Sequence, residues 1–157
     1  MSAAASPLAP ADLVWEIVRN QNSYLVKKKQ SGGVQFSRDP LNLKNLNSRK
    51  HAGFVNNKAL GVLPAEKGGV KVLSKKESAI QQPAKAITET TYHGGKSTRH
   101  TYKAVANQAA KRGYRPDLRE AAVARVSAIR QSQRPTKPEP EKKPRGAKAK
   151  KAAEASS

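Results

Sequence analysis

The sequence contains no cysteine and few aromatic or acidic residues, and each shortage excludes a class of protein. Without cysteine, a disulfide scaffold and a cysteine-ligated zinc site are both excluded. Phe, Trp and Tyr make up 4% of the chain, which disfavours a single-strand platform built on stacked aromatic rings. Asp and Glu number only 11, and no carboxylate pair or Ser/His/Asp arrangement points to catalysis. We therefore expect neither an enzyme nor a cofactor.

Long apolar segments are also missing. No run approaches the ~18 apolar residues of a membrane-spanning helix, and no cysteine is available to carry a lipid. The N-terminal segment, MSAAASPLAP, lacks the basic and apolar regions of a secretory signal. We therefore expect no membrane association, and the lack of cysteine is compatible with a reducing cytosolic or nuclear compartment.

Positive charge is the most pronounced feature of the composition. The 31 Lys and Arg residues exceed the 11 Asp and Glu residues, which gives a formal net charge of +20 at pH 7. Residues 134–157 contain eight basic and three acidic residues, so this tail accounts for +5 and leaves +15 on the remainder. Such an excess favours a polyanionic partner, and nucleic acid remains once a membrane surface is disfavoured.

Local patterns predict an α+β fold in a single domain at residues 12–133. Residues 12–19 have the spacing of a short helix, with Asp12 as the expected cap and Trp15 as the anchor to the core. Short apolar segments separated by turns predict a small, mainly antiparallel sheet. The expected strands are residues 23–29, 34–37, 53–55, 59–63, 70–73 and 87–92. Residues 1–11 are expected to be a flexible lead, and residues 134–157 a basic tail that is disordered or ordered by RNA.

Two basic helices are predicted at residues 97–112 and 116–131. Ser97 is a suitable cap for the first helix, and Gly113 is a suitable end. Pro116 suits the first position of the second helix, whose first turn carries the acidic residues that a helix dipole favours. At about 100° per residue, one side of each helix is apolar. These sides contain Thr98, Tyr102, Val105, Ala106 and Ala109 in the first helix, and Leu118, Ala122, Val126 and Ile129 in the second.

Basic residues outside these apolar sides are the candidate RNA contacts. No acidic residue occurs between Glu89 and Asp117, so the polar side of the first helix is not the alternately charged face of an ordinary solvated helix. Arg119 and Arg130 are expected to project together, about 16 Å apart at ~1.5 Å per residue. A run of lysines beside the expected hairpin turn fits either a solvated tip or phosphate binding. The candidate set is Lys27, Lys28, Lys29, Arg49, Lys50, Lys96, Arg99, His100, Lys103, Lys111, Arg112, Arg115, Arg119 and Arg130.

Other motifs give weaker indications. The segment 94–97, GGKS, resembles the end of a phosphate-binding loop, but the motif requires Gly where this chain has Thr90. The three histidines are far apart in sequence and match no zinc-ligand spacing, so no metal site is expected. Three classes stay open: a structural RNA-binding protein of a large ribonucleoprotein, a chromatin protein, and an enzyme or processing factor that acts on RNA. The tail resembles that of a linker histone, but a winged helix would place its helices before its hairpin.

Four motifs in order carry a family resemblance. They are LVWEIVRN at 13–20; SYLVK at 23–27; RDPLNL at 38–43 with Asn47 and Ser48; and YRPDLR at 114–119 with Ser127, Ala128 and Ile129. Together, from about residue 12 to 135, they resemble the L28e family of eukaryotic large-subunit ribosomal proteins. The lead and the tail match no motif of that family.

The resemblance implies a non-enzymatic constituent of the cytosolic large (60S) ribosomal subunit that binds ribosomal RNA and neighbouring ribosomal proteins. Such a protein would pass through the nucleus and nucleolus during assembly, and would need no small-molecule substrate and no homo-oligomer. A nucleolar assembly factor shares this domain type, but it would be expected to bring cysteines and an acidic extension. Recognition of RNA shape is expected, because A-form RNA hides its base edges in a deep groove.

Overall fold

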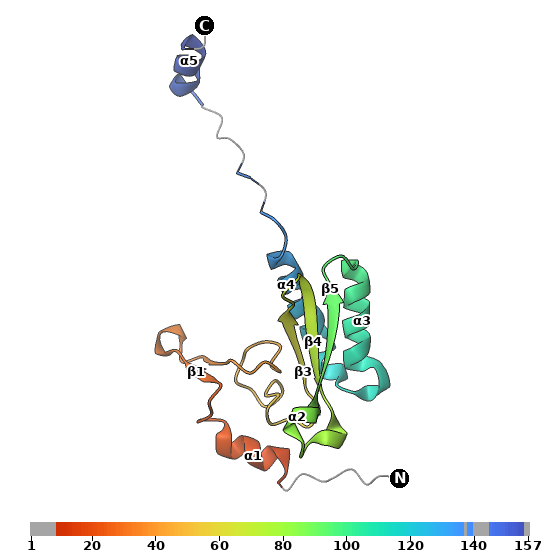
Figure 1. Ribbon diagram of the computed structural model, residues 1–157. Helices are drawn as coiled ribbons and strands as arrows, with labels where there is room; N and C mark the ends of the chain where they lie inside the picture. The colour runs from red at the N-terminus through yellow and green to blue at the C-terminus, as the bar shows by residue number, and fades with distance from the viewer. Residues whose placement is uncertain (1–8, 137, 140–144, 156–157) are drawn as a thin grey trace.

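The computed structural model describes residues 9–136, 138–139 and 145–155, so most of the expected lead lies outside the described residues. Its main layer is a three-stranded antiparallel sheet of β3 (Leu60–Pro64), β4 (Gly69–Lys75) and β5 (Ile87–His93), in the order β3-β4-β5. Val72 pairs with Val62 on one side and with Thr90 on the other. Two helices, α3 (Thr98–Ala110) and α4 (Arg119–Ser132), lie against one face of this sheet (Figure 1). The predicted α+β class is confirmed.

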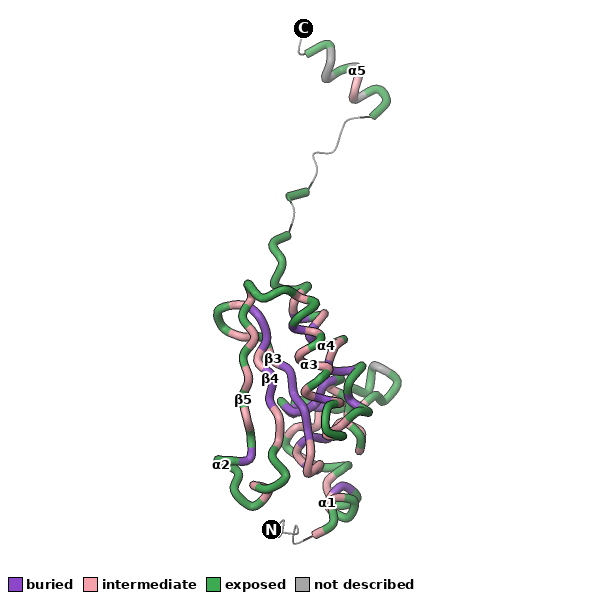
Figure 2. The backbone as a smooth tube through the Cα atoms, turned by 90° about the vertical axis from the view of Figure 1, so that its right-hand side faces the viewer, coloured by how far each residue is buried: buried purple, intermediate pink, exposed green. Residues whose placement is uncertain are grey.

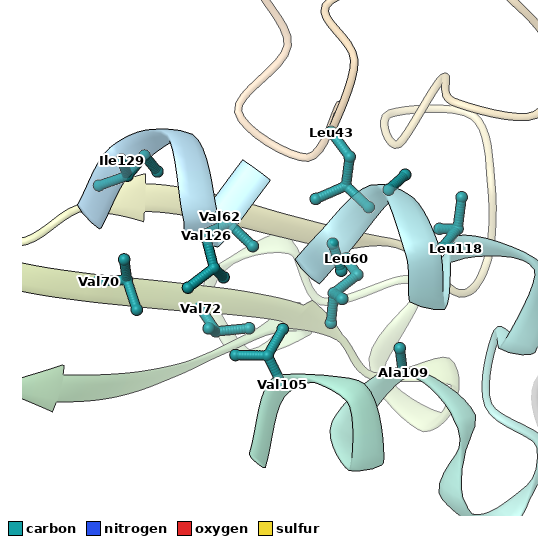
Figure 3. Packing of buried hydrophobic residues seen from close by; sticks show 12 residues of the cluster. Leu43, Leu60, Val62, Val70, Val72, Val105, Ala109, Leu118, Val126 and Ile129 are labelled. Atoms are coloured by element: carbon teal, nitrogen blue, oxygen red, sulfur yellow. The ribbon is translucent and has the colours of Figure 1, made fainter. Parts of the chain in front are cut away.

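The main core lies between this sheet and the two helices. Because side chains alternate along a strand, Leu60 and Val62 of β3 and Val70 and Val72 of β4 point to the same face, and all four are at most 2% exposed. They meet apolar residues of α3 and α4 (Figure 3). Burial of each such side chain contributes roughly 1.5–3 kcal/mol. This layer therefore holds most of the apolar stabilisation that a chain of this composition can supply.

The predicted apolar side of the second helix is confirmed, whereas that of the first is rotated. The buried residues of α3 are Thr101, Val105 and Ala109. Thr101 tolerates burial because its hydroxyl donates to the Ser97 carbonyl at 3.1 Å. Ser97 makes no side-chain capping bond. Leu118, just before α4, and Ala122, Val126 and Ile129 within it are buried as predicted.

The connection between α3 and α4 is more irregular than the predicted helix end at Gly113. A short 3-10 turn, η3 (Lys111–Gly113), follows α3, and a second, η4 (Pro116–Leu118), precedes α4. Arg112 and Gly113 both have a left-handed backbone, with φ of 63° and 62°. For Arg112 this conformation is costly, because it carries a Cβ atom.

The N-terminal part forms a separate, smaller layer. Helix α1 (Ala11–Val18) packs through Trp15, which is 9% exposed, against Ala52 and Val55, and this cluster is separate from the main core. The predicted cap is wrong: Pro10 occupies that position, and Asp12 lies in the first turn. Strands β1 (Leu25–Lys27) and β2 (Gln35–Ser37) form the predicted hairpin, with the 3-10 turn η1 (Lys29–Ser31) between them.

The strand predicted at residues 53–55 is wrong, because these residues form a turn. The amides of Val55 and Asn56 both bond to the Ala52 carbonyl. A Cβ at Gly53 would collide with Leu41, so the chain passes too closely there for a side chain. The backbone groups of the turn are satisfied by side chains from elsewhere in the fold, and no neighbouring strand is needed to pair with them.

The remaining described elements are short. They are η2 (Glu77–Ala79) and α2 (Pro83–Ala86) between β4 and β5, and α5 (Ala147–Glu154) in the tail. Figure 2 shows that buried backbone runs along β3 and β4, whereas β5 is a partly exposed edge strand. None of the helices in the described ranges is long and apolar enough to cross a membrane.

Candidate nucleic-acid interface

Most predicted RNA contacts lie on the surface with their side chains exposed. On α3, Arg99, His100 and Lys103 are exposed on the side opposite the buried residues. The ion pairs between described residues involve Arg19, Arg49, Lys58, Lys71 and Arg115, so none of them lies on α3. The exposed members of the set are Lys27, Lys28, Lys29, Lys50, Lys96, Arg99, His100, Lys103, Lys111, Arg112 and Arg119.

The lysines of the hairpin lie at a different place from those of the helices. Lys27 ends β1, and Lys28 and Lys29 lead into η1. This hairpin projects from the body on the side away from α3 (Figure 1). The structure therefore divides the exposed candidates into at least two separate surfaces, and no single flat patch contains them all.

Arg115, a predicted RNA contact, is bound inside the protein. Its Nε and Nη2 atoms donate to the two carboxylate oxygens of Asp117, each at 2.8 Å. Its Nη1 donates to the Lys58 carbonyl at 2.8 Å, and Nη2 also reaches the Lys50 carbonyl at 2.9 Å. This hydrogen bonding lowers the pKa of Asp117. The guanidinium thus joins the loop around residues 50–58 to the start of the second helical segment.

Arg130 has a similar internal role at the other end of α4. Its Nη1 donates to the Gly94 carbonyl at 2.7 Å, and Nη2 donates to the Lys96 carbonyl at 2.9 Å. The glycine-rich segment at 94–97 therefore turns carbonyl oxygens toward an arginine of the protein itself. The expected joint projection with Arg119 is not present, because only Arg119 extends into solvent.

Arg49, the third half-buried member of the set, fastens α1 to the following loop. Its Nη2 lies 2.7 Å from an Asp12 carboxylate oxygen, and its Nη1 contacts the Asn56 side chain. Asn56 in turn donates to the Arg49 and Ala52 carbonyls. The three half-buried arginines of the candidate set, Arg49, Arg115 and Arg130, will be called the clamp arginines.

The structural role of Lys75 had no clear signal in the sequence. Lys75 Nζ donates to the carbonyls of Gly53, Phe54 and Asn56, and burial lowers its pKa. Strand alternation places Lys75 on the face opposite Val72, toward this turn, but its partners lie about twenty residues away in the sequence. Arg38 and Lys44 are further exposed cations in the predicted polar loop.

The histidines do not form a metal site. Across the residues that the structure describes, no group of three His, Cys, Asp or Glu side chains is placed to hold a metal ion. His51 Nδ1 lies 3.0 Å from the Ser48 hydroxyl, and burial, with nearby Lys44 and Lys50, lowers its pKa. His51 therefore belongs to the polar network of the loop.

Comparison with known proteins identifies relatives along most of the chain. The protein named large ribosomal subunit protein eL28 from Schizosaccharomyces pombe is 40% identical over 127 residues, which cover 80% of this chain and 94% of that protein. The protein of the same name from Dictyostelium discoideum is 35% identical over 126 residues, covering 80% and 90% respectively. The one from Caenorhabditis elegans is 40% identical over 79 residues, covering 50% and 60%.

A family model gives the same result over most of the chain. The model described as the Ribosomal L28e protein family matches residues 13–132, from α1 to the end of α4. The match includes the sheet and helix layer, the clamp arginines and every candidate RNA contact. The chain belongs to the Ribosomal L28e protein family.

Proposed function

We propose that this chain is a structural constituent of the large subunit of the eukaryotic ribosome, where it binds ribosomal RNA and neighbouring ribosomal proteins. The observation that carries the proposal is the match to relatives named large ribosomal subunit proteins, over nearly their full length. The net charge of +20 and the exposed cations on α3 support an RNA partner. In this role the protein works in the cytoplasm and passes through the nucleus while the subunit assembles.

The proposed mechanism is neutralisation of phosphate groups on folded RNA. Lys and Arg side chains displace counterions from the RNA backbone, and the released ions supply a large part of the binding free energy. The main core fixes α3 and α4 relative to the sheet, so the cations on them keep a constant spacing. A fixed spacing favours RNA of one shape, because phosphate positions follow the shape of the folded RNA.

The clamp arginines support this interface indirectly. Each uses its donors on atoms of the protein, so the direct contacts are assigned to the exposed members of the candidate set. Arg115 and Arg130 hold the two ends of the α4 segment, and Arg49 joins α1 to the loop that contains Lys50. Loss of a clamp arginine would therefore displace RNA-binding groups without removing one.

The test compares two triple variants with equal charge change. Arg99, Lys103 and Arg119 are changed together to Gln, and the control changes the exposed Lys67, Lys76 and Lys85, which lie outside the candidate set. Incorporation into large subunits is measured by gradient sedimentation after a high-salt wash, and folding by circular dichroism. We expect only the first variant to be depleted from subunits. The slope of its RNA affinity against salt concentration should fall by about one for each phosphate that the protein no longer neutralises.

Two results would contradict the proposal. Equal depletion of both folded variants would show that overall charge, and not this surface, decides binding. Recovery of the wild-type protein with chromatin and not with large subunits would favour the chromatin alternative.

A further inference from the structure

A cleft of about 640 Å³ lies between β5 and α3, next to the exposed cations at the end of α3. It exists because α4 packs on β3 and β4, and the inward side of β5 carries threonines and Tyr92 where the other strands carry valine and leucine. Thr90 and Tyr92 form the wall from the sheet, and Asn107 and Gln108 form the wall from α3. The fully buried core residues of the sheet therefore come from β3 and β4, Tyr92 of β5 packs against them while only partly buried, and the cleft lies beside its ring.

The lining of the cleft combines an aromatic ring with groups that both donate and accept hydrogen bonds. Tyr92 is half-buried, its hydroxyl donates to Gln108 Oε1 at 3.4 Å, and burial raises its pKa. Asn107 and Thr90 add an amide and a hydroxyl to the lining. An aromatic face beside amide groups matches a nucleobase, which offers a flat ring and an edge of donors and acceptors.

The mouth of the cleft is positively charged. Lys111 and Arg112 line it from the end of α3. The one carboxylate in the lining, Glu77, is paired with Lys58 at 3.0 Å. The left-handed backbone of Arg112, with φ of 63°, is unfavourable for a residue with a side chain, and such strain is concentrated at binding sites.

We propose that this cleft binds a single unpaired nucleotide of ribosomal RNA. The base lies against Tyr92 with its edge at Asn107 and Gln108, and its phosphate lies at Lys111 and Arg112. This inference rests on the proposed function and extends it, because it adds selection of a base at one position to contacts with phosphates. Lys96 Nζ lies 5.4 Å from the centroid of the Tyr92 ring, so the base would share the ring with this cation. An acidic protein segment would also suit the charge, but it would leave the amides of Asn107 and Gln108 without a matching planar edge.

The experiment probes ribosomal RNA in intact large subunits that contain the full-length protein. Gln108→Leu removes the amide at nearly constant size, and Arg112→Gly removes the cation while suiting the left-handed backbone. Gln131→Leu, on the exposed part of α4, is the control. Base-specific chemical modification is compared with that of wild-type subunits. We expect one unpaired nucleotide to become several-fold more reactive in the first two variants and to stay protected in the control.

An unchanged modification pattern in subunits that contain Gln108→Leu and Arg112→Gly overturns the proposal. If these variants do not enter subunits, ultraviolet cross-linking of wild-type subunits decides instead. A nucleotide attached to Tyr92, Asn107 or Gln108 supports the site. Nucleotides attached only to residues outside the cleft, or a protein attached at these three residues, overturn it. If the wild-type protein is absent from large subunits, the proposed function itself fails, which is a separate outcome.

Discussion

The sheet and helix layer and the N-terminal loop region, residues 11–58, are held together by different forces. The sheet and helix layer is stabilised by buried aliphatic side chains such as Leu60, Val72 and Val126, each at most 2% exposed. The second has a small cluster around Trp15, and its turns depend on buried polar groups. Asp39, at 3% exposure, accepts the amides of Leu41 at 2.9 Å and of Phe54 at 3.0 Å.

The cations likewise fall into two populations, those bound to the protein itself and those exposed to solvent. Arg49 lies in the loop region, and Lys75 and Arg115 contact this region from other elements. All three donate to carbonyl or carboxylate oxygens of the protein. On the solvent side of α3, basic residues such as Arg99 and Lys103 remain exposed, while the opposite side of the helix is buried through Val105 and Ala109. A high net charge therefore does not identify the ligand contacts until the internal partners are known.

The largest expected effect is the loss of apolar packing in the sheet and helix layer. Leu60→Ala should lower the free energy of unfolding by about 2–5 kcal/mol, because Leu60 is completely buried and its removal leaves a cavity. Urea denaturation followed by circular dichroism measures the change. Ile87→Ala, at a residue that is 43% exposed, is the control and should cost far less. Similar losses for both variants would mean that the main core does not dominate stability.

The corresponding test in the loop region is Asp39→Ala. This change leaves the amides of Leu41 and Phe54 without their acceptor, at a cost of about 1–3 kcal/mol. Hydrogen exchange should show faster opening at residues 53–56 than in β3 and β4. Asp39→Asn retains one acceptor oxygen and should lose less. Uniform acceleration across both regions would show that they unfold as one unit.

A third pair of variants separates a clamp arginine from an RNA contact. Arg115→Gln removes bonds to Asp117 and to two backbone carbonyls, so it should destabilise the fold by about 1–2 kcal/mol. Arg119→Gln should leave stability unchanged and reduce the slope of RNA affinity against salt concentration by about one. Unfolding curves and salt titrations of both proteins measure these effects. A reduced salt dependence in folded Arg115→Gln would return Arg115 to the set of direct contacts.

The pH dependence of stability in acid should report on the interaction between Arg115 and Asp117. The lowered pKa of Asp117 means that its stabilising contribution is complete above its ordinary value of 3.8 and is lost as the pH falls through the lower folded value. In Arg115→Gln this acid-dependent part of the stability should largely disappear.

Local periodicity predicted the helices and most strands, because neighbouring residues decide which side of an element is apolar. The apolar side of α4 was correct for this reason. The clamp role of Arg130 was not predictable, since its acceptors, the Gly94 and Lys96 carbonyls, lie more than thirty residues away in sequence. The turn at residues 53–55 was missed for the same reason, because Asp39 and Lys75 satisfy its backbone. Pattern alone cannot distinguish a cation that binds the fold from one that binds a ligand.

The smallest expected effect concerns His51 and tests whether protonation of this residue destabilises the polar network of the loop. Burial, together with Lys44, Lys50 and Arg115, keeps its pKa below the ordinary value of 6.5. The unfolded chain therefore binds this proton more readily, and stability should fall as the pH drops from about 6.5 through the folded value. Thermal unfolding at about pH 7.5 and about pH 5.5 should show a smaller decrease for His51→Gln than for the wild type. Equal decreases would mean that His51 protonates as easily in the folded protein as in the unfolded chain, and that the loop region accommodates one more positive charge at no cost.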